Sequence, residues 1–225
     1  MGHISIAIDG PSGAGKSTLA RELAARLGYV YVDTGAIYRT LGLYVARCGG
    51  DCGRAEDVIA RLPALDVRLD HGPDGVQRTL LGGEDVSRAI RANEVSHWAS
   101  QVSAIPEVRQ HLLELQRGFA RTQDVVMDGR DIGTVVLPRA QVKIFLTASP
   151  ETRARRRWKE LQEKGQDVPY ETVLRETKER DWADAHRAVA PLRPAEDAVV
   201  LDTSSLDLDE SLEALVALVK GRTEP

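Results

Sequence analysis

The amino-acid sequence predicts an α/β fold in which helices flank a mostly parallel five-stranded sheet. Five short apolar runs, rich in valine and isoleucine, do not alternate regularly with polar residues, which is typical of parallel strands buried on both faces. Helical patterns lie between these runs, and strands that alternate with helices build a doubly wound sheet. We therefore expect ligands to bind beyond the carboxyl ends of the strands.

The expected elements follow one another along the whole chain. The predicted strands are residues 4–8, 29–32, 125–127, 142–146 and 199–201. The predicted helices are residues 17–27, 36–48, 94–121, 150–164, 170–187 and 208–219. In the first helix Leu19, Leu23 and Leu27 recur every four residues on one face, and Gly28 provides a stop signal.

Residues 66–86 interrupt this alternation. Two short apolar stretches flank the turn-forming run 71–75, and Gly82-Gly83 follows them. The pattern predicts short strands around turns, and hence a small antiparallel insert in an otherwise parallel core. We expect residues 1–225 to form a single domain that contains this insert.

The composition is that of a folded protein and excludes several kinds of partner. With 42% hydrophobic and 28% charged residues the chain is expected to fold, and its net charge of −4 argues against a nucleic-acid polymer as partner. No apolar run approaches the roughly 18 residues of a membrane span, and the apolar start of the chain is too short for a signal peptide. The lone cysteines Cys48 and Cys52 make a poor zinc site and suit a reducing compartment. We expect a cytoplasmic monomer that does not bind membranes.

A glycine-rich phosphate loop follows the first predicted strand. The run Gly10-Pro11-Ser12-Gly13-Ala14-Gly15-Lys16-Ser17 matches the pattern G-x-x-x-x-G-K-[ST], and Thr18 comes next in the following helix. The glycines let several backbone N–H groups face one point, where the helix N-terminus adds partial positive charge. We expect a nucleoside triphosphate to bind here, with Lys16 on its outer phosphates and the Ser17 hydroxyl as a ligand of Mg²⁺.

Arginines recur near the predicted strand ends and on one later helix. These arginines are Arg39, Arg109, Arg130, Arg180 and Arg187. Asp184 is spaced to share a helix face with Arg180 and Arg187. The same trio can be a surface salt-bridge ladder of small energetic value, and Asp33 or Thr34 can simply cap the helix that follows them.

The number of arginines indicates that the transferred group goes to a phosphate. An alcohol acceptor needs a carboxylate base, for which Asp33 and Asp128 are the candidates. A phosphate acceptor is mostly ionised at pH 7 and needs charge compensation instead, because two unit charges about 4 Å apart repel by about 4 kcal/mol at an effective dielectric constant of about 20. Arginine supplies a permanent charge in a planar fork, so many arginines without a histidine base favour a phosphate acceptor.

A basic cluster begins the helix after the fourth predicted strand. It comprises Arg153, Arg155, Arg156, Arg157 and Lys159. The cluster is either a solvated cationic face or part of a mobile lid that closes over the transferring phosphoryl group. The phosphate loop favours the lid, to which we assign residues 150–170.

Eight sequence runs between Ile6 and Leu192 occur in the order found in one known family. They are IAIDGPSGAGKST, DTGAIYR, GEDVS with IR shortly after it, SQVSAIPEVR, DGRDIGTVVLP, KIFLTAS, LQEKG and RAVAPL. On these runs the chain closely resembles the bacterial type of cytidylate kinase, among the P-loop nucleoside monophosphate kinases. The resemblance implies a P-loop kinase core, a helical lid, and a monophosphate-binding part at residues 33–100 that carries the insert. It also implies that the γ-phosphoryl group of ATP is transferred to CMP or dCMP with Mg²⁺.

The resemblance also implies a role for each residue of the predicted site. Residues 10–18 and Arg153 would bind ATP. Ser100, Arg109 and Asp131 would contact the cytosine ring, with Thr34 near the base. Arg39 and Arg130 would hold the acceptor phosphate beside Arg187, while Asp184 and Arg180 would lie at the sugar. The catalytic residues would be Lys16, Arg130, Arg187, Arg156 and Arg157.

The assignment of the base is chemically consistent, and three questions stay open. Cytosine carries an amine that Asp131 can accept, whereas uracil presents an acceptor at the same position. One alternative is a P-loop kinase for another small acceptor. Another is a nucleotide-switched regulatory protein, although the N-K-x-D motif of guanine-nucleotide switches is absent from the sequence. The carboxylate that organises Mg²⁺ is open between Asp9 and Asp128.

Overall fold

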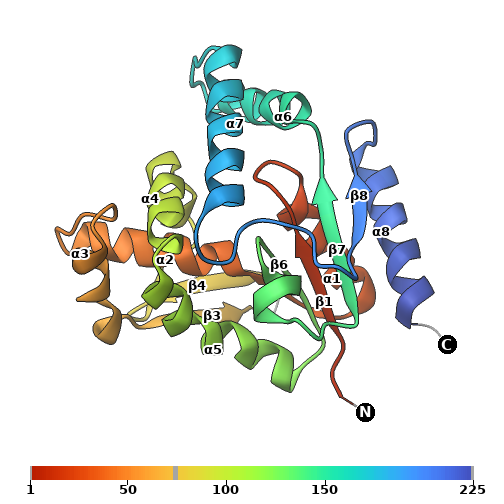
Figure 1. Ribbon diagram of the computed structural model, residues 1–225, viewed down its shortest axis with the longest axis horizontal. Coiled ribbons are helices and arrows are strands. Elements are labelled where there is room, and N and C mark those ends of the chain that lie inside the picture. Colours follow the sequence, from red (N-terminus) through yellow and green to blue (C-terminus); the bar gives the residue numbers. More distant parts are fainter. Residues whose placement is uncertain (1, 73–75, 224–225) are drawn as a thin grey trace.

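A computed structural model describes residues 2–72 and 76–223. Its central sheet has the strand order β2-β6-β1-β7-β8 (Figure 1). The strands are β1 (Ser5–Asp9), β2 (Val30–Asp33), β6 (Val125–Gly129), β7 (Val142–Thr147) and β8 (Val199–Asp202). All four pairings are parallel, which confirms the predicted parallel sheet and each predicted strand within two residues.

Both faces of this sheet are covered, as the continuous apolar runs predict. Ile6 and Ile8 of β1 pack against α1 (Lys16–Leu27) and α8 (Leu208–Thr223) on one face. Ala7, which points the other way, packs with Met127 against a π-helical turn, η3 (Ile132–Val136), and α5 (Pro106–Thr122). A strand buried on both sides cannot alternate apolar with polar residues, so its sequence reads as one apolar run.

The single long helix predicted for residues 94–121 is wrong, because the chain forms two helices there. They are α4 (Asn93–Ser103) and α5, and Ile105 between them has extended backbone angles (φ −82°, ψ 120°). Pro106 occupies the first position of α5, where proline is tolerated, but it disfavours helical geometry at the preceding residue. The apolar period continues across the break, which is why the pattern reads as one helix.

The predicted antiparallel insert is confirmed as a separate three-stranded sheet of order β3-β4-β5. Its strands are β3 (Val67–His71), β4 (Gln77–Leu81) and β5 (Glu84–Asp85), paired antiparallel. Residues 73–75 of the predicted turn lie outside the described residues. The insert packs beside α2 (Thr34–Arg47), which starts directly after β2.

A second apolar core joins α2 and α4 with the short elements that follow α2. Those elements are α3 (Ala55–Ile59) and a 3₁₀ turn, η1 (Leu62–Ala64). A further 3₁₀ turn, η2 (Ala89–Arg91), packs through Ile90 in a separate small cluster with Ala36 and Val95. The sequence pattern did not predict these short turns. Ile37, Leu41 and Val102 are fully buried in this second core. One apolar core thus lies at the parallel sheet and another around α2.

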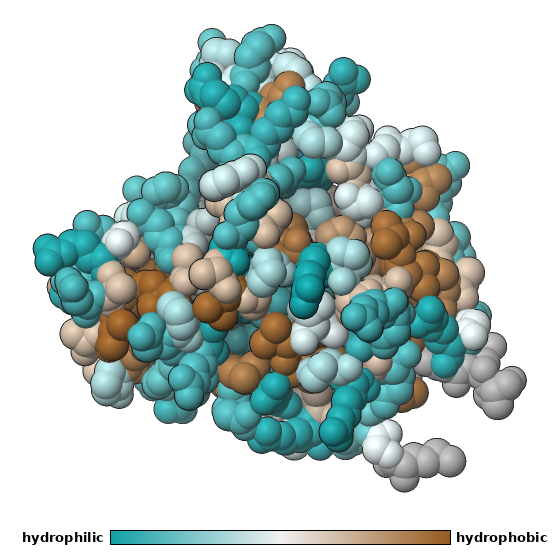
Figure 2. Space-filling view, in the orientation of Figure 1, coloured by the Kyte–Doolittle hydropathy of each residue, from teal (hydrophilic) through white to brown (hydrophobic). Residues whose placement is uncertain are grey.

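Two consecutive helices, α6 (Pro150–Glu163) and α7 (Tyr170–His186), project from the body as a hairpin in which α6 lies across the outer part of α7 (Figure 1). Ala154, Leu161 and Val173 form a small core between them, and the Trp158 indole donates to the carbonyl of Val168 at 3.0 Å. Figure 2 shows hydrophilic side chains over most of this hairpin and apolar ones gathered near β7, β8 and α8. Within residues 2–72 and 76–223 no helix is long and apolar enough to span a membrane.

Candidate active site

The phosphate loop has the backbone that its glycines predict. Gly13 and Gly15 have positive φ angles of 76° and 90°, and Gly15 directly precedes α1. At Gly10 a Cβ atom would lie 1.9 Å from the carbonyl oxygen of Leu146, so only glycine fits where the loop passes β7. The loop therefore curls back over the sheet, with the N-terminus of α1 opening into it.

Lys16 and Ser17 make different contacts at the start of α1. The Lys16 ammonium is buried and donates to the carbonyl of Pro11 at 2.7 Å. Burial, followed by the nearby charge of Arg130, lowers the pKa of Lys16, and an anionic ligand in the loop would oppose both effects. The exposed Ser17 donates its hydroxyl hydrogen to Asp128 at 2.9 Å, so the loop is tied to the end of β6.

The two candidate carboxylates for Mg²⁺ lie in different surroundings. Asp128 accepts hydrogen bonds from Ser17 and from the Tyr31 hydroxyl, both at 2.9 Å. Asp9 accepts the backbone N–H groups of Ile132 and Gly133, both at 2.7 Å, and so holds the turn that follows β6. Burial raises the pKa of each carboxyl to about 6. Of these two carboxylates, Asp128 is the one that hydrogen-bonds a side chain of the phosphate loop.

Asp131 lies between two buried arginines at the start of η3. The Arg109 guanidinium donates to one Asp131 oxygen, and the Arg187 Nη2 atom lies 3.7 Å from the other. Arg109 also lies 5.6 Å from the ring centre of Tyr38, close enough for a cation–π contact. Tyr38 was not among the predicted site residues, although the run DTGAIYR contains it. Ser100 is half-buried on α4, and no described side-chain contact joins its hydroxyl to this group.

A second arginine group faces the same region from α7, β6 and α2. Arg130 donates to Asp184 at 2.9 Å, and burial together with the charge of Arg130 lowers the pKa of Arg180 to about 10. Among the described residues, three buried guanidinium nitrogens have no hydrogen-bond partner: Arg39 Nε, Arg180 Nε and Arg187 Nη2. Unpaired buried donors are unusual in folded proteins, so their gathering at one place indicates an anion site.

Asp33 holds two arginines at the end of β2. It accepts from Arg39 at 2.6 Å and from Arg91 at 3.2 Å, and its carboxylate caps α2 by accepting from Ala36 N–H at 3.0 Å. Burial alone would raise the pKa of Asp33, but Arg39 and Arg91 outweigh it and leave the pKa below its ordinary value. Arg91 was not among the predicted site residues, although the short IR run after GEDVS contains it; its pairing with Asp33 places it at the site. Thr34 donates to the carbonyl of Asp128 at 2.8 Å.

The three predicted lid arginines point to three different places. Arg153 is buried, donates to the carbonyl of Ser12 at 3.1 Å, and pairs with both oxygens of Asp181. Arg156 donates to the carbonyl of Thr203 at 2.9 Å, beyond the end of β8. Arg157 donates to Asn93 at the start of α4 and so reaches the other side of the site.

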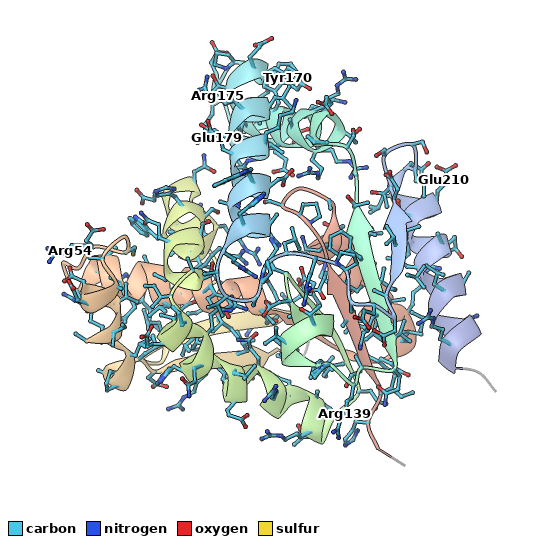
Figure 3. The ribbon with its side chains drawn as sticks, viewed as in Figure 1. Arg54, Arg139, Tyr170, Arg175, Glu179 and Glu210 are labelled. Atoms are coloured by element: carbon cyan, nitrogen blue, oxygen red, sulfur yellow. The ribbon has the colours of Figure 1, made fainter. Side chains whose placement is uncertain are left out.

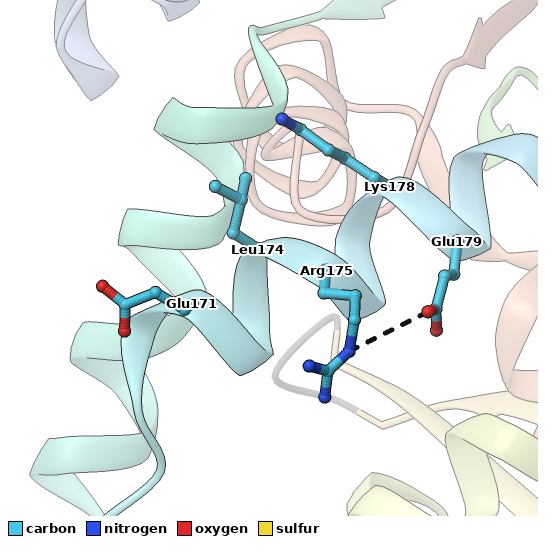
Figure 4. Close-up of a pocket in the computed structure, with 5 residues that line it drawn as sticks. All are labelled: Glu171, Leu174, Arg175, Lys178 and Glu179. Carbon is cyan, nitrogen blue, oxygen red and sulfur yellow. Dashed lines mark ion pairs between the residues drawn. The ribbon is translucent and has the colours of Figure 1, made fainter.

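Two surface hollows lie outside this arginine group. One of about 330 Å³ is lined by Glu171, Leu174, Arg175, Lys178 and Glu179 on α7, with Arg175 and Glu179 paired at 3.9 Å (Figure 4). The other, of about 290 Å³, is lined by Glu151, Thr152, Arg155, Arg156, Lys159 and Ser204. Figure 3 shows the labelled Arg175 and Glu179 on the outward part of α7, whereas nitrogen-rich side chains crowd its other end near the strand ends. The first hollow is therefore separate from the predicted site.

Comparison with known sequences identifies a protein family. The sequence model of the cytidylate kinase family matches residues 6–221. The cytidylate kinase of Caldicellulosiruptor bescii is 49% identical over 218 residues, 97% of this chain and 96% of that protein. The cytidylate kinase of Vibrio cholerae is 49% identical over 217 residues, 96% of each chain.

A solved structure shares the fold at much lower sequence identity. An uncharacterised protein from Eubacterium ventriosum superposes with a TM-score of 0.53 at 13% identity, covering 98% of this chain and 99% of that one. This likeness concerns the fold alone. The family model, by contrast, matches nearly the whole sequence, and relatives are 49% identical over almost their full length. The chain therefore belongs to the cytidylate kinase family.

Proposed function

We propose how the residues of this site divide the work of the family's reaction, the transfer of the γ-phosphoryl group of ATP to CMP or dCMP. The observation that carries the proposal is the set of three buried guanidinium nitrogens without a hydrogen-bond partner, on Arg39, Arg180 and Arg187. A site that already holds a triphosphate needs such donors only if a second anion binds beside the first.

The acceptor phosphate is held by charge compensation, without a general base. Arg39 and Arg130 receive its oxygens, with Arg187 beside them. The pairing of Asp33 with two arginines argues against Asp33 as a base for an alcohol acceptor, because a carboxylate with a lowered pKa takes up a proton poorly. Lys16 and lid arginines stabilise the charge that moves from donor to acceptor, and transfer is direct and in line.

The cytosine ring is recognised by the Asp131 group. Asp131 accepts from the cytosine amine, while Arg109, already fixed on Asp131 and over Tyr38, donates to the ring acceptors. Ser100 and Thr34 lie on the adjoining α4 and α2 and complete the base side of the site. Asp184 and Arg180 lie on one face of α7 and bind the sugar hydroxyls.

Ser17 and Asp128 fit a magnesium ion bound together with ATP. Hard divalent cations prefer oxygen ligands, and Mg²⁺ uses few protein ligands because substrate phosphates and water supply the rest. The exposed Ser17 hydroxyl lies beside the buried Asp128 carboxylate. Among the described residues no cluster of three or more histidine, cysteine or acidic side chains could hold a metal alone, which agrees with a site shared with the nucleotide. Ser17 and Asp128 would hold Mg²⁺, which would supply positive charge against the phosphate groups.

The donor side extends from the phosphate loop along α6. Arg153 bonds the loop backbone at Ser12, and we propose that the hollow of about 290 Å³ between α6 and Ser204 receives the adenine. Residues 150–170 act as a lid, in which Arg157 is the arginine nearer the acceptor side and Arg156 the one nearer the adenine. The monophosphate-binding part is residues 33–100.

Release of ADP from Mg-ATP with a panel of acceptors tests the proposal. We expect turnover with CMP and dCMP and little with UMP, AMP, GMP or small alcohols. Hydrolysis of ATP without any acceptor preference would contradict it. Arg130→Ala should lose most turnover and still bind ATP; near-normal turnover would remove Arg130 from the acceptor site.

The sequence further suggests a monomeric, cytoplasmic protein, and both points stay predictions. Light scattering coupled to size-exclusion chromatography measures the first. Fractionation of cells that produce the protein measures the second.

A further inference from the structure

Tyr31 reaches the carboxylate that receives the Ser17 hydroxyl. Its own hydroxyl donates to Asp128 Oδ1 at 2.9 Å, while Ser17 donates to Asp128 Oδ2 at the same distance. Each oxygen of this buried carboxylate therefore has its own protein donor. None of the roles proposed for the site uses Tyr31.

We propose that Tyr31 is a positioning residue for magnesium, which fixes the rotation of the Asp128 carboxylate so that one oxygen stays turned toward Ser17. The inference rests on the metal site proposed at Ser17 and Asp128. It predicts that the Tyr31 hydroxyl affects how strongly Mg²⁺ promotes nucleotide binding, and leaves metal-free nucleotide binding unaffected.

The rotation of this carboxylate needs a dedicated partner. The terminal torsion of an aspartate is broad and has no single sharp minimum. Lys16 is close enough to attract the Asp128 carboxylate electrostatically, so Ser17 is not the sole group that draws on its oxygens. A hydrogen bond from the neutral, partly buried Tyr31 hydroxyl occupies Oδ1 and adds no charge that would repel a metal ion.

The strand register makes Tyr31 a rigid support. β2 and β6 are parallel neighbours that pair Tyr31 with Val126 and Asp33 with Asp128. The Tyr31 ring packs against the apolar cluster between the sheet, α1 and α8, which restricts its movement. Thr34, just beyond β2, holds the backbone carbonyl of Asp128 at 2.8 Å. The same strand end thus fixes both the backbone and the side chain of Asp128.

Binding of a non-hydrolysable ATP analogue, with and without magnesium, tests the inference. Isothermal titration calorimetry gives Kd in excess Mg²⁺ and in EDTA, and the ratio of the two is the magnesium factor. For Tyr31→Phe, which keeps the ring, we expect this factor to fall about five- to tenfold, while Kd in EDTA stays within about twofold of the wild type. Tyr29→Phe is the matched control, because Tyr29 packs against the same cluster just before β2.

Ser17→Ala separates failure of this inference from failure of the metal site. If Ser17→Ala loses the magnesium factor and Tyr31→Phe keeps it, the metal site stands and the role of Tyr31 is overturned. Equal loss of affinity in Mg²⁺ and in EDTA for Tyr31→Phe also overturns it, because Tyr31 would then support only the fold. A full magnesium factor in Ser17→Ala refutes the proposed metal site, and the inference with it.

Discussion

Replacement of Asp131 by asparagine removes the carboxylate that two buried arginines share. The side chains of Arg109, Asp131 and Arg187 are 8%, 6% and 8% exposed, so water screens these charges poorly. Asparagine has nearly the same shape but no charge. Two guanidinium groups would then remain buried near one another without their common counter-ion.

The cost to stability follows from this burial. Breaking a buried ion pair by removing one partner typically costs about 3–5 kcal/mol, because the remaining charge is left unpaired. We expect Asp131→Asn to lower the free energy of unfolding by about that amount, measured by urea denaturation followed by circular dichroism. Glu213→Gln is the control: it breaks an exposed pair with Arg26 at 2.5 Å and should change stability little.

The same substitution should weaken discrimination between cytosine and uracil. An asparagine amide can donate to the carbonyl that uracil carries in place of the cytosine amine. Sites built on such hydrogen bonds reject the wrong partner strongly, so we expect the ratio of kcat/KM for CMP over UMP to fall about a hundredfold. An unchanged ratio would show that Asp131 does not read the base. A loss of stability below about 1 kcal/mol would show that the arginines do not depend on it.

Three further perturbations test other parts of the site. Arg91→Ala should raise KM for CMP several-fold and leave KM for ATP unchanged, because Arg91 shares Asp33 with Arg39. Arg88→Ala is the control, since Arg88 is an exposed arginine beside the same turn. Equal effects of the two substitutions on KM for CMP would exclude a specific role for Arg91. The pKa of Asp33 is lower in the folded than in the unfolded chain, so its contribution to stability is present above about pH 4 and is lost as pH falls through the folded pKa. The difference in unfolding free energy between wild type and Asp33→Asn should therefore be largest near neutral pH and shrink under acid, and a difference independent of pH would contradict the shift. Gly10→Ala should lower stability by at least about 2 kcal/mol, because its Cβ atom would lie 1.9 Å from the Leu146 carbonyl oxygen; an unchanged melting temperature would mean that β7 moves away freely.

The parallel sheet could be predicted from the sequence because strands buried on both faces consist of continuous apolar runs. Ile6, Ala7 and Ile8 face alternate layers, and both layers are apolar. The break between α4 and α5 is harder to recognise in the sequence. Pro106 is acceptable as the first residue of a helix, so a proline inside a periodic pattern signals either a kink or a new start.

The pairings inside the site could not be predicted in the same way. Motif spacing and family resemblance single out Arg39, Arg130 and Asp131 as residues, but not their partners. The contact of Tyr31 with Asp128 joins positions 97 residues apart and depends on the register of β2 against β6. Arg91 meets Asp33 only because η2 packs beside α2. Such contacts depend on how the sheet and helices pack together. A local sequence pattern carries no information about that packing.

The aspartates of the site orient its arginines and leave some of their N–H donors unoccupied. Arg39, Arg109 and Arg130 each bind one aspartate, and these pairs hold the planar forks in place before any substrate binds. Guanidinium groups carry five donors, so one aspartate leaves others free for a phosphate. Arg39 Nε, which has no hydrogen-bond partner, is such a free donor. An acceptor phosphate therefore need not break an ion pair to bind, and the donors are already oriented when charge develops on the transferred group. Removing an aspartate should then disorder the arginine and raise KM for CMP, whereas removing the arginine should lower kcat as well.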